Sequence, residues 1–297
     1  MKVGLLGTGR MGAAIARRLI DCGHSLIVWN RSVGKAAALV EHGATLATSP
    51  ADLAANAQII ISILTDAAAI EATFAGPEGV FAADIAGRII IEMSTVGPQT
   101  QIDLAERLAA RGAALVECPV GGTVGPARDG KLLGLVGGAD GDVARVRPII
   151  EQMCRRVEHV GPIGSGARMK LAVNLPLMVY WQALGEAIAL AKPIGLDPVR
   201  LMDILADTSG APTAIKLRGP LVASVLNGAS AGVTQFDIDS IRKDLRTMLA
   251  EGEHLGYDLL TTRAAMQAFD AAASAGLGSH DSTELAAWWV ANARQAS

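Results

Sequence analysis

The sequence predicts an α/β domain with a parallel sheet, followed by an all-α domain that begins with a long interdomain helix. Three observations lead to this fold class. Short apolar runs alternate with amphipathic stretches in the first half of the chain, whereas the second half shows almost no strand pattern. The breaker-rich segment Gly161–Gly166 separates the two patterns. We therefore expect a first domain at residues 1–162 and a second domain at residues 163–297.

The strands of the first domain are marked by short runs of Val, Ile and Leu. Residues 59–64 (Ile-Ile-Ile-Ser-Ile-Leu) are apolar almost throughout, which is typical of a strand covered on both faces. The expected strands are Val3–Leu6, Ser25–Trp29, Ile59–Leu64, Arg88–Met93, Ala114–Glu117 and Lys131–Val136. The expected helices are Met11–Asp21, Val33–His42, Gln99–Arg111 and Val143–Cys154. Such alternation favours a parallel sheet with helices on both faces.

The second domain is expected to be helical. Its first helix runs from Ala167 to Pro193, and Pro176 is the position at which it could bend. The other expected helices are Pro198–Leu205, Thr213–Val225, Ile238–Leu255, Leu259–Ala275 and Ser282–Ala293.

Composition and charge exclude several classes of protein. With 51% hydrophobic residues, the 297-residue chain is too apolar for a disordered protein. Its net charge of -3 offers no basic surface for nucleic acid. The longest uncharged apolar stretch, residues 171–185, is shorter than the about 20 residues that span a membrane. We therefore expect neither a nucleic-acid partner nor a membrane span.

Cysteine spacing and the start of the chain bear on the compartment. Cys22, Cys118 and Cys154 are far apart, so they form neither a metal-binding pair nor a disulfide framework. The chain runs directly into its first expected strand, without a basic region or cleavage site of a signal peptide. We expect a soluble cytoplasmic protein without a metal site.

Residues 7–12 carry the clearest motif, Gly-Thr-Gly-Arg-Met-Gly, which matches Gly-x-Gly-x-x-Gly between a strand and a helix. In this context the glycines allow a tight turn, close approach of a pyrophosphate and close packing of the helix. A glycine turn without a ligand is the plainer alternative. The cofactor contacts expected here are Gly7, Thr8, Gly9, Arg10, Met11 and Gly12.

The end of the second expected strand indicates which dinucleotide is bound. An NAD site usually has Asp or Glu there, whereas this chain has Asn30, Arg31 and Ser32. Arg31 can pair with a 2′-phosphate, and its two neighbours can donate hydrogen bonds. We therefore expect NADP, with NAD possible, since an arginine that only lies in solvent would tolerate NAD.

With these motifs the chain resembles the β-hydroxyacid dehydrogenase family, which includes 3-hydroxyisobutyrate dehydrogenases and semialdehyde reductases. The resemblance covers essentially the whole chain. It rests on the segments Gly7–Gly12, Glu117–Thr123, Gly164–Asn174 and Phe236–Asp244, with a weaker match at Gly276–Ser282. It implies a Rossmann-type first domain and a helical second domain that takes part in substrate binding and oligomerisation.

Lys170 and Asn174 are the expected catalytic pair. They lie four residues apart in the long helix, so their side chains share one face. Reduction of a carbonyl needs a proton on its oxygen, and a buried lysine can act as the general acid or base. The resemblance implies this role for Lys170 and a substrate-binding role for Asn174. A solvated helix charge is the alternative, and the apolar residues around Lys170 argue against it.

The resemblance also implies a substrate loop at Glu117–Thr123. The family form is Asp-Ala-Pro-Val-Ser-Gly-Gly, whereas here Gly121 replaces the serine and Thr123 replaces the last glycine. Backbone N–H groups of Gly121 and Gly122, together with the Thr123 hydroxyl, can still hold a carboxylate. A plain turn without substrate contact is the alternative.

Further cofactor contacts come from the resemblance alone. The loops after two expected strands carry Leu64, Thr65 and Thr95, which match cofactor contacts of the family. Lys243 matches a family lysine near the nicotinamide and ribose. Because the surrounding segment is rich in charge, a surface role for Lys243 is the alternative.

Together these features predict an NADP-dependent oxidoreductase that interconverts a small β-hydroxy acid, or another short hydroxy acid, with its aldehyde or semialdehyde acid. The alternatives are an imine reductase of the same fold, whose members usually lack a lysine at the position of Lys170, and a non-catalytic NADP-binding module. We expect a small carboxylate as the substrate and a homodimer or homotetramer as the assembly, since the apolar helices need burial.

Overall fold

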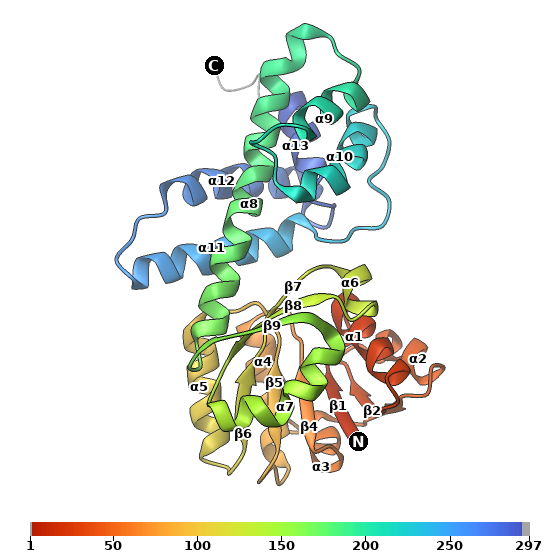
Figure 1. Ribbon diagram of the computed structural model, residues 1–297, viewed down its shortest axis with the longest axis vertical. Coiled ribbons are helices and arrows are strands. Elements are labelled where there is room, and N and C mark those ends of the chain that lie inside the picture. Colours follow the sequence, from red (N-terminus) through yellow and green to blue (C-terminus); the bar gives the residue numbers. More distant parts are fainter. Residues whose placement is uncertain (1, 293–297) are drawn as a thin grey trace. The chain divides into compact units, whose positions relative to one another are not determined.

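The computed structural model describes residues 2–292 of the chain (Figure 1). These residues fall into two compact units, the first ending at Lys170 and the second beginning at Leu171. The predicted boundary after residue 162 lies in the turn between a strand that ends at Gly161 and a helix that begins at Ser165.

The first unit is built on a nine-stranded sheet with the order β3-β2-β1-β4-β5-β6-β8-β7, in which β9 pairs with β8. Neighbouring strands from β3 to β6 are all parallel, in the order typical of doubly wound nucleotide-binding folds. The strands are β1 (Lys2–Leu6), β2 (Ser25–Trp29), β3 (Thr45–Leu46), β4 (Ile59–Ser62), β5 (Ile89–Glu92), β6 (Ala114–Glu117), β7 (Val120–Gly121), β8 (Leu132–Gly137) and β9 (Cys154–Gly161). The parallel sheet predicted from the apolar runs is thus confirmed for this part.

Beyond β6 the sheet departs from the prediction, because β8 runs antiparallel to β6 and β7. The connection from β6 to β8 holds only β7 and the short helix α6 (Val124–Arg128), not a long helix that would return the chain across the sheet. Strand β9 was not predicted. Its sequence, Cys-Arg-Arg-Val-Glu-His-Val-Gly, is charged and partly exposed, so it lacks the apolar run of a central strand.

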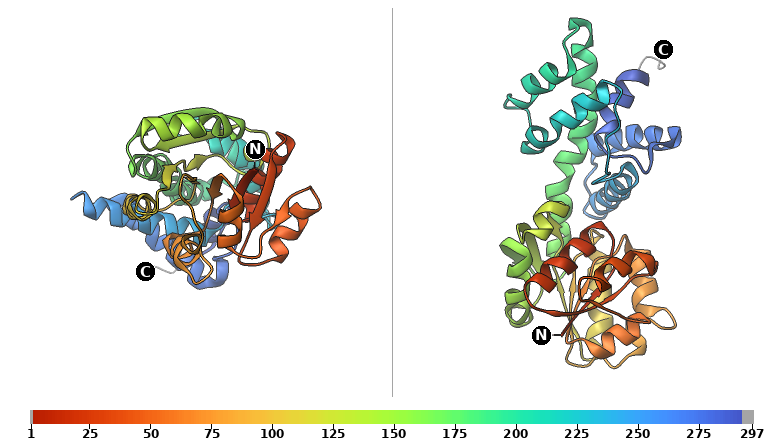
Figure 2. Two further views of the ribbon diagram at one scale, coloured as in Figure 1. Left: turned by 90° about the horizontal axis from the view of Figure 1, so that it is seen from below. Right: turned by 90° about the vertical axis from the view of Figure 1, so that its right-hand side faces the viewer.

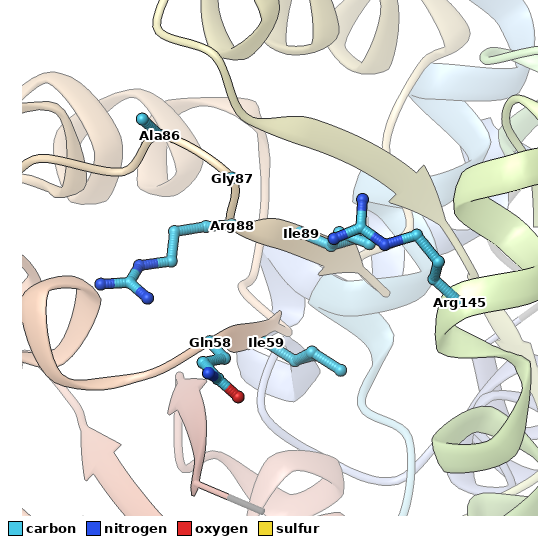
Figure 3. Close-up of a pocket in the computed structure, with 7 residues that line it drawn as sticks. All are labelled: Gln58, Ile59, Ala86, Gly87, Arg88, Ile89 and Arg145. Carbon is cyan, nitrogen blue, oxygen red and sulfur yellow. The ribbon is translucent and has the colours of Figure 1, made fainter.

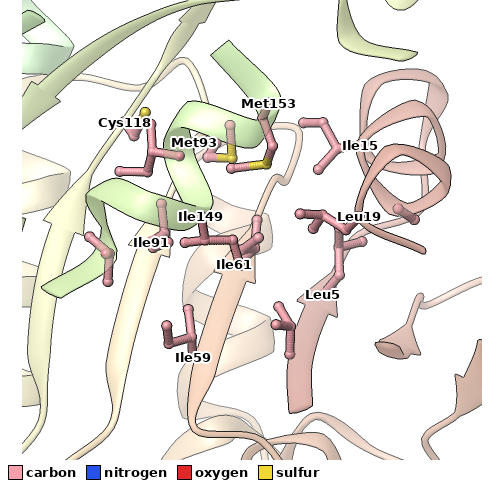
Figure 4. Packing of buried hydrophobic residues seen from close by; sticks show 14 of the residues in the cluster. Leu5, Ile15, Leu19, Ile59, Ile61, Ile91, Met93, Cys118, Ile149 and Met153 are labelled. Carbon is pink, nitrogen blue, oxygen red and sulfur yellow. The ribbon is translucent and has the colours of Figure 1, made fainter. Parts of the chain in front are cut away.

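Helices cover both faces of this sheet (Figure 2). They are α1 (Arg10–Asp21), α2 (Gly34–Val40), α3 (Pro50–Asn56), α4 (Ala67–Ala75), α5 (Pro98–Ala109) and α7 (Asp140–Met153). Alternate residues of one strand point to opposite faces: Ile59 and Ile61 join the apolar cluster of α1, α2 and α7 (Figure 4), whereas Ile60 joins the cluster of α3, α4 and α5. This explains why β4 is apolar along its length.

The second unit is helical, as predicted. Helix α8 (Ser165–Ala191) contains Pro176 and continues from the first unit into the second. It is followed by α9 (Pro198–Ala206), α10 (Thr213–Leu226), α11 (Ile238–His254), α12 (Leu260–Ala272) and α13 (Glu284–Asn292). The last predicted helix was drawn to Ala293, which lies outside the described residues. Across residues 2–292, the structure contains no helix with the length and apolar character needed to cross a membrane.

Small residues allow close helix packing in the second unit. A Cβ atom on Gly185 of α8 would stand 3.3 Å from the Ala286 Cα atom of α13 and equally far from the Trp289 side chain. The apolar cluster around this contact includes Trp181, Leu184 and Phe269.

One buried ion pair ties three segments of the second unit together. Asp281 is fully buried and accepts hydrogen bonds from Arg218 Nη2 (2.5 Å), the Gln235 N–H (2.9 Å) and the Thr283 N–H (3.0 Å). The Arg218 guanidinium lies 5.6 Å from the ring centroid of Trp181. Burial alone would raise the pKa of Asp281, but the hydrogen bonds, led by that from Arg218, outweigh it and lower the pKa below its ordinary value.

We expect the substitution Asp281→Ala to lower the free energy of unfolding by about 3 kcal/mol, because it leaves the half-buried Arg218 without its counter-charge. Chemical denaturation of the full chain measures this. Asp258→Ala is the control: Asp258 pairs with Arg263, but both side chains are 60% exposed, so the loss should stay within about 1 kcal/mol.

The lowered pKa of Asp281 determines how its contribution to the free energy of unfolding depends on pH. The carboxylate contributes stability above its unfolded-state pKa of about 3.9 and loses that contribution as the pH falls through the lower folded-state pKa. The difference between the wild-type protein and Asp281→Ala should therefore shrink on acidification below about pH 4. Equal stability of the two proteins at neutral pH would contradict this assignment.

Candidate cofactor and catalytic site

The glycine loop joins β1 to α1, and its three glycines differ in what surrounds them. Gly7 has a φ of +94°, and a Cβ atom on it would lie 2.2 Å from the Ile63 carbonyl oxygen. A Cβ atom on Gly12 would lie 1.9 Å from the Gly7 carbonyl oxygen. Gly9 differs, because no atom lies within 4 Å of where its Cβ would be. The first and last glycines are thus required by packing, and the middle one leaves open space at the start of α1.

That open space has the character of an anion site. Gly9 is the N-cap residue of α1 and provides no side chain to cap it, and the first turn contains no acidic residue. The N–H groups of this turn can therefore bind a phosphate. Thr8 is 2% exposed, and its hydroxyl oxygen is buried without a hydrogen-bond partner among the described residues. A buried hydroxyl of this kind needs an acceptor, and a bound cofactor would supply one.

Asn30 fixes the end of β2 against this loop. Its Oδ1 accepts from the Thr8 N–H (3.0 Å), and its Nδ2 donates to the Ser32 carbonyl oxygen (3.0 Å). Most of the hydrogen-bonding capacity of Asn30 is therefore used within the loop. Arg31 and Ser32 are exposed, and the Arg31 guanidinium makes no hydrogen bond or ion pair with any of residues 2–292. Of the three predicted residues, Arg31 is the one best placed to receive a 2′-phosphate.

The loops after β4 and β5 lie at the same edge of the sheet as the glycine loop. The Leu64 N–H donates to Ser94 Oγ at 2.8 Å, so the two loops are bonded to each other. Thr65 is exposed and Thr95 is half-buried. Since β1 lies between β2 and β4, the predicted contacts of the first unit up to Thr95 all gather at the carboxyl ends of adjacent parallel strands.

The two glycines of the predicted substrate loop differ in whether a side chain could replace them. Gly122 has a φ of +128°, and a Cβ atom there would lie 2.7 Å from Leu132 Cδ2. Gly121 pairs with Leu133, and a Cβ atom there would meet only an ordinary contact at 3.5 Å. A serine would therefore fit at position 121, so packing does not require the glycine that this chain has there. Thr123 is the exposed N-cap of α6, and its side chain makes no cap hydrogen bond.

Lys170 and Asn174 lie one turn apart on α8. Lys170 is buried, with 7% exposed, and Asn174 is half-buried. Lys243 lies on α11 in the second unit, and its ammonium stands 2.5 Å from Oδ1 of the buried Asp244. The predicted contact of Lys243 with the cofactor stays a prediction.

The sequence did not predict that two carboxylates of the first unit are buried, and Glu117 was expected only as the first residue of the substrate loop. Glu92 ends β5, Glu117 ends β6, and the two are paired in the register of these strands. Both are fully buried. Burial raises the pKa of Glu117 to about 7, against hydrogen bonds from α8 that lower it. The only signal in the sequence was an acidic residue at the end of two otherwise apolar strands.

A hollow of about 290 Å³ lies at the opposite edge of the sheet (Figure 3). It is lined by the starts of β4 and β5, including Gln58 and Arg88, and by Arg145 of α7. Ligands of doubly wound folds bind at the carboxyl ends of the strands, so we do not assign the cofactor to this hollow.

Two domain models match the chain. Residues 2–161 match the NAD binding domain of 6-phosphogluconate dehydrogenase, and residues 164–289 match the model described as NAD-binding of NADP-dependent 3-hydroxyisobutyrate dehydrogenase. Both models describe binding of a nicotinamide dinucleotide. The match to these models shows that the protein binds NAD(P). The open space at Gly9 and the Thr8 hydroxyl fit such a group.

Named proteins with similar sequences are a reductase and a dehydrogenase. Glyoxylate/succinic semialdehyde reductase 1 of Arabidopsis thaliana is 34% identical over 281 residues, which are 95% of this chain and 96% of that protein. The 3-hydroxyisobutyrate dehydrogenase of Pseudomonas aeruginosa is 34% identical over 84% of this chain and 85% of its own. Among solved structures, Psf3 in complex with NADP+ and 2-OPP is 28% identical with a TM-score of 0.85, and the match covers 96% of this chain and 99% of that chain.

The different roles of the glycines can be tested with a matched pair of variants. We expect Gly9→Ala to keep the melting temperature of the wild type and to bind NADPH about tenfold or more weakly, because its methyl group occupies the space open to the pyrophosphate. Gly12→Ala should instead lower the melting temperature, since its Cβ would collide with the Gly7 carbonyl oxygen.

Thermal melts and fluorescence titration with NADPH measure the two effects. Unchanged NADPH affinity of Gly9→Ala would mean that the cofactor does not approach the loop at this point.

Proposed function

The chain belongs to the β-hydroxyacid dehydrogenase family, and from this premise we propose that it is an NADP-dependent oxidoreductase that interconverts a small hydroxy acid with its aldehyde or semialdehyde acid. The general class, an NAD(P)-dependent dehydrogenase or reductase acting on CH–OH groups, follows from family membership. The choice of NADP, the substrate and the role of each residue are the proposal. The observation that supports it most is the buried side chain of Lys170 on the helix that also carries Asn174.

Lys170 acts as the general acid in reduction. The nicotinamide, when bound, supplies the hydride to the carbonyl carbon, and negative charge develops on the carbonyl oxygen. The Lys170 ammonium donates its proton to that oxygen, and in the oxidation direction the neutral amine takes the proton from the hydroxyl group. A buried ammonium interacts more strongly with the developing alkoxide than one in bulk water. Asn174, one turn further along α8, hydrogen-bonds the substrate and orients it.

The substrate carboxylate is held by the loop at Gly121–Thr123. Backbone N–H groups of the turn, with its positive φ at Gly122, and the Thr123 hydroxyl serve as donors. The family serine is replaced by Gly121, so this loop offers the substrate carboxylate fewer side-chain hydrogen-bond donors. Aromatic residues make up only 3% of the chain, which favours a small polar acid over a ligand that needs stacking. Glyoxylate and succinic semialdehyde, named for the Arabidopsis relative, are the first candidates.

NADP is preferred because of the residues at the end of β2. Arg31 is exposed without a partner among the described residues, and no acid is present at positions 30–32 to repel a 2′-phosphate. Leu64, Thr65, Thr95 and Lys243 complete the proposed set of cofactor contacts.

We also propose that the protein assembles as a homodimer or homotetramer and works in the cytoplasm. Large apolar side chains stay exposed where α8 ends and α9 begins: Leu190 is 83% exposed, Ile194 68% and Val199 60%. Such residues favour burial against another copy. The cysteines of the described residues are all unpaired, which suits a reducing compartment.

The role of Lys170 has a direct test. We expect Lys170→Ala to lower kcat for reduction of the preferred aldehyde acid by about 10²–10⁴-fold, because the carbonyl oxygen loses its proton donor. The affinity for NADPH should not change. Steady-state assays with glyoxylate and succinic semialdehyde, together with NADPH titration, measure both. Lys192→Ala, an exposed lysine just after α8, is the control and should behave as the wild type. Unaltered turnover of Lys170→Ala would overturn the proposal.

Cofactor preference is tested at Arg31. We expect Arg31→Asp to lower the ratio of kcat/KM for NADPH to that for NADH by about 100-fold or more, since the variant loses the cation and repels the 2′-phosphate. Arg155→Asp, at an exposed position of β9, makes the same change in net charge elsewhere and should leave the ratio as it is. A wild-type ratio in Arg31→Asp would show that Arg31 does not bind the phosphate.

A further inference from the structure

The carboxylate of Glu117 is built into the core at the junction of β6 and α8. Its Oε1 accepts a hydrogen bond from the Gly166 N–H at 2.7 Å, and its Oε2 accepts one from the Ala167 N–H at 3.2 Å. Both N–H groups belong to the first turn of α8, where backbone donors have no partner within the helix. A strand residue thus supplies the N-terminal cap of α8.

Two glycines make room for this carboxylate. A Cβ atom on Gly137 of β8 would stand 2.2 Å from Glu117 Oε1, and one on Gly166 would stand 2.5 Å from the Leu135 carbonyl oxygen and 3.2 Å from Glu117 Oε1. The helix start can therefore lie directly against the sheet only because neither position carries a side chain. The two glycines therefore determine where the carboxylate meets the helix, and the two N–H donors determine which group it binds.

The next turn of the same helix carries Lys170. Residues four apart on a helix lie on one face, so Lys170 follows Gly166 directly along the face that begins at the carboxylate. A shift of the first turn against β6 would carry the Lys170 ammonium with it. A misplacement of about 1 Å can cost about 100-fold in rate when a group must meet a reacting atom.

The neighbouring carboxylate, Glu92, holds the proposed cofactor loops in a similar way. Its Oε2 accepts from Gln101 Nε2 (2.6 Å) and from the Ser94 N–H (3.1 Å), and its Oε1 accepts from Ser94 Oγ. Ser94 Oγ in turn accepts from the Leu64 N–H at 2.8 Å. The two carboxylates are paired across β5 and β6. One therefore fixes the loops after β4 and β5, and the other fixes the start of α8.

We propose that Glu117 is a positioning residue: its carboxylate fixes the first turn of α8 on the sheet and thereby sets where the Lys170 ammonium stands relative to the loops that Glu92 holds. This inference rests on the proposed function, because it needs Lys170 to be the proton donor. Glu117 does not act on the substrate. Its effect reaches the reaction through Lys170, which distinguishes it from a residue that only stabilises the fold.

The test is a double-mutant cycle on kcat. Glu117→Gln keeps the volume of the side chain but replaces one carboxylate oxygen by an NH2 donor, so either the Gly166 or the Ala167 N–H group faces a donor where it had an acceptor. We expect kcat to fall by about 10–100-fold with unchanged NADPH affinity. In the Lys170→Ala background the same substitution should cause no further loss, since the group that it positions is gone.

Glu92→Gln is the matched comparison on the neighbouring strand. It weakens the hold on the Leu64 and Ser94 loops, so NADPH affinity should fall more than kcat does. Glu117→Met, an apolar replacement of similar length, guards against failure of the glutamine variant to fold, since it buries no polar group, and it should show the same loss of kcat as Glu117→Gln.

Each outcome decides a separate point. A Glu117→Gln or Glu117→Met protein that binds NADPH and keeps the wild-type kcat would overturn the positioning role. An additional loss of rate in the double variant would also overturn it, because the effect would then bypass Lys170. Wild-type turnover of Lys170→Ala alone would instead remove the proposed function, whatever Glu117 does.

Discussion

The hydrogen bonds between the Glu117 carboxylate and the first turn of α8 are the contact on which the arrangement of the first unit most depends. A fully buried carboxylate is costly unless donors surround it, and here the helix start supplies them. In return, the helix gains partners for N–H groups that would otherwise have none. Because both sides need the contact, it defines one position for α8 on the sheet.

At the cofactor edge of the sheet, contacts between neighbouring loops likewise fix the position of each loop. Gly7 and Gly12 are fixed by close backbone approaches, Asn30 joins the glycine loop to the end of β2, and Glu92 with Ser94 joins the next two loops. Loops of different strands are thus held by one another before any ligand binds. A preorganised edge of this kind loses little freedom on binding, which leaves more of the binding energy for the dinucleotide.

Periodicity and motif spacing were enough to predict the central strands, the helices of the second unit and the glycine loop, because each leaves a local pattern. Strand β9 was missed since Arg155 and Arg156 make it look like a surface segment. The Ala-rich α4 has no clear apolar face, and the two-residue β3 is too short to show alternation. Glu117 was read only as the start of a loop, because its partners Gly166 and Ala167 are distant in sequence and bind through backbone atoms.

We propose that the protein transfers a hydride from NADPH to the carbonyl carbon of a small aldehyde acid. NADPH deuterated at nicotinamide C4, with mass spectrometry of the product, follows this transfer. We expect one deuterium on the carbinol carbon of the hydroxy acid formed from glyoxylate or succinic semialdehyde. Absence of hydroxy acid with both substrates, or a hydroxy acid without deuterium from either C4 position, would contradict it.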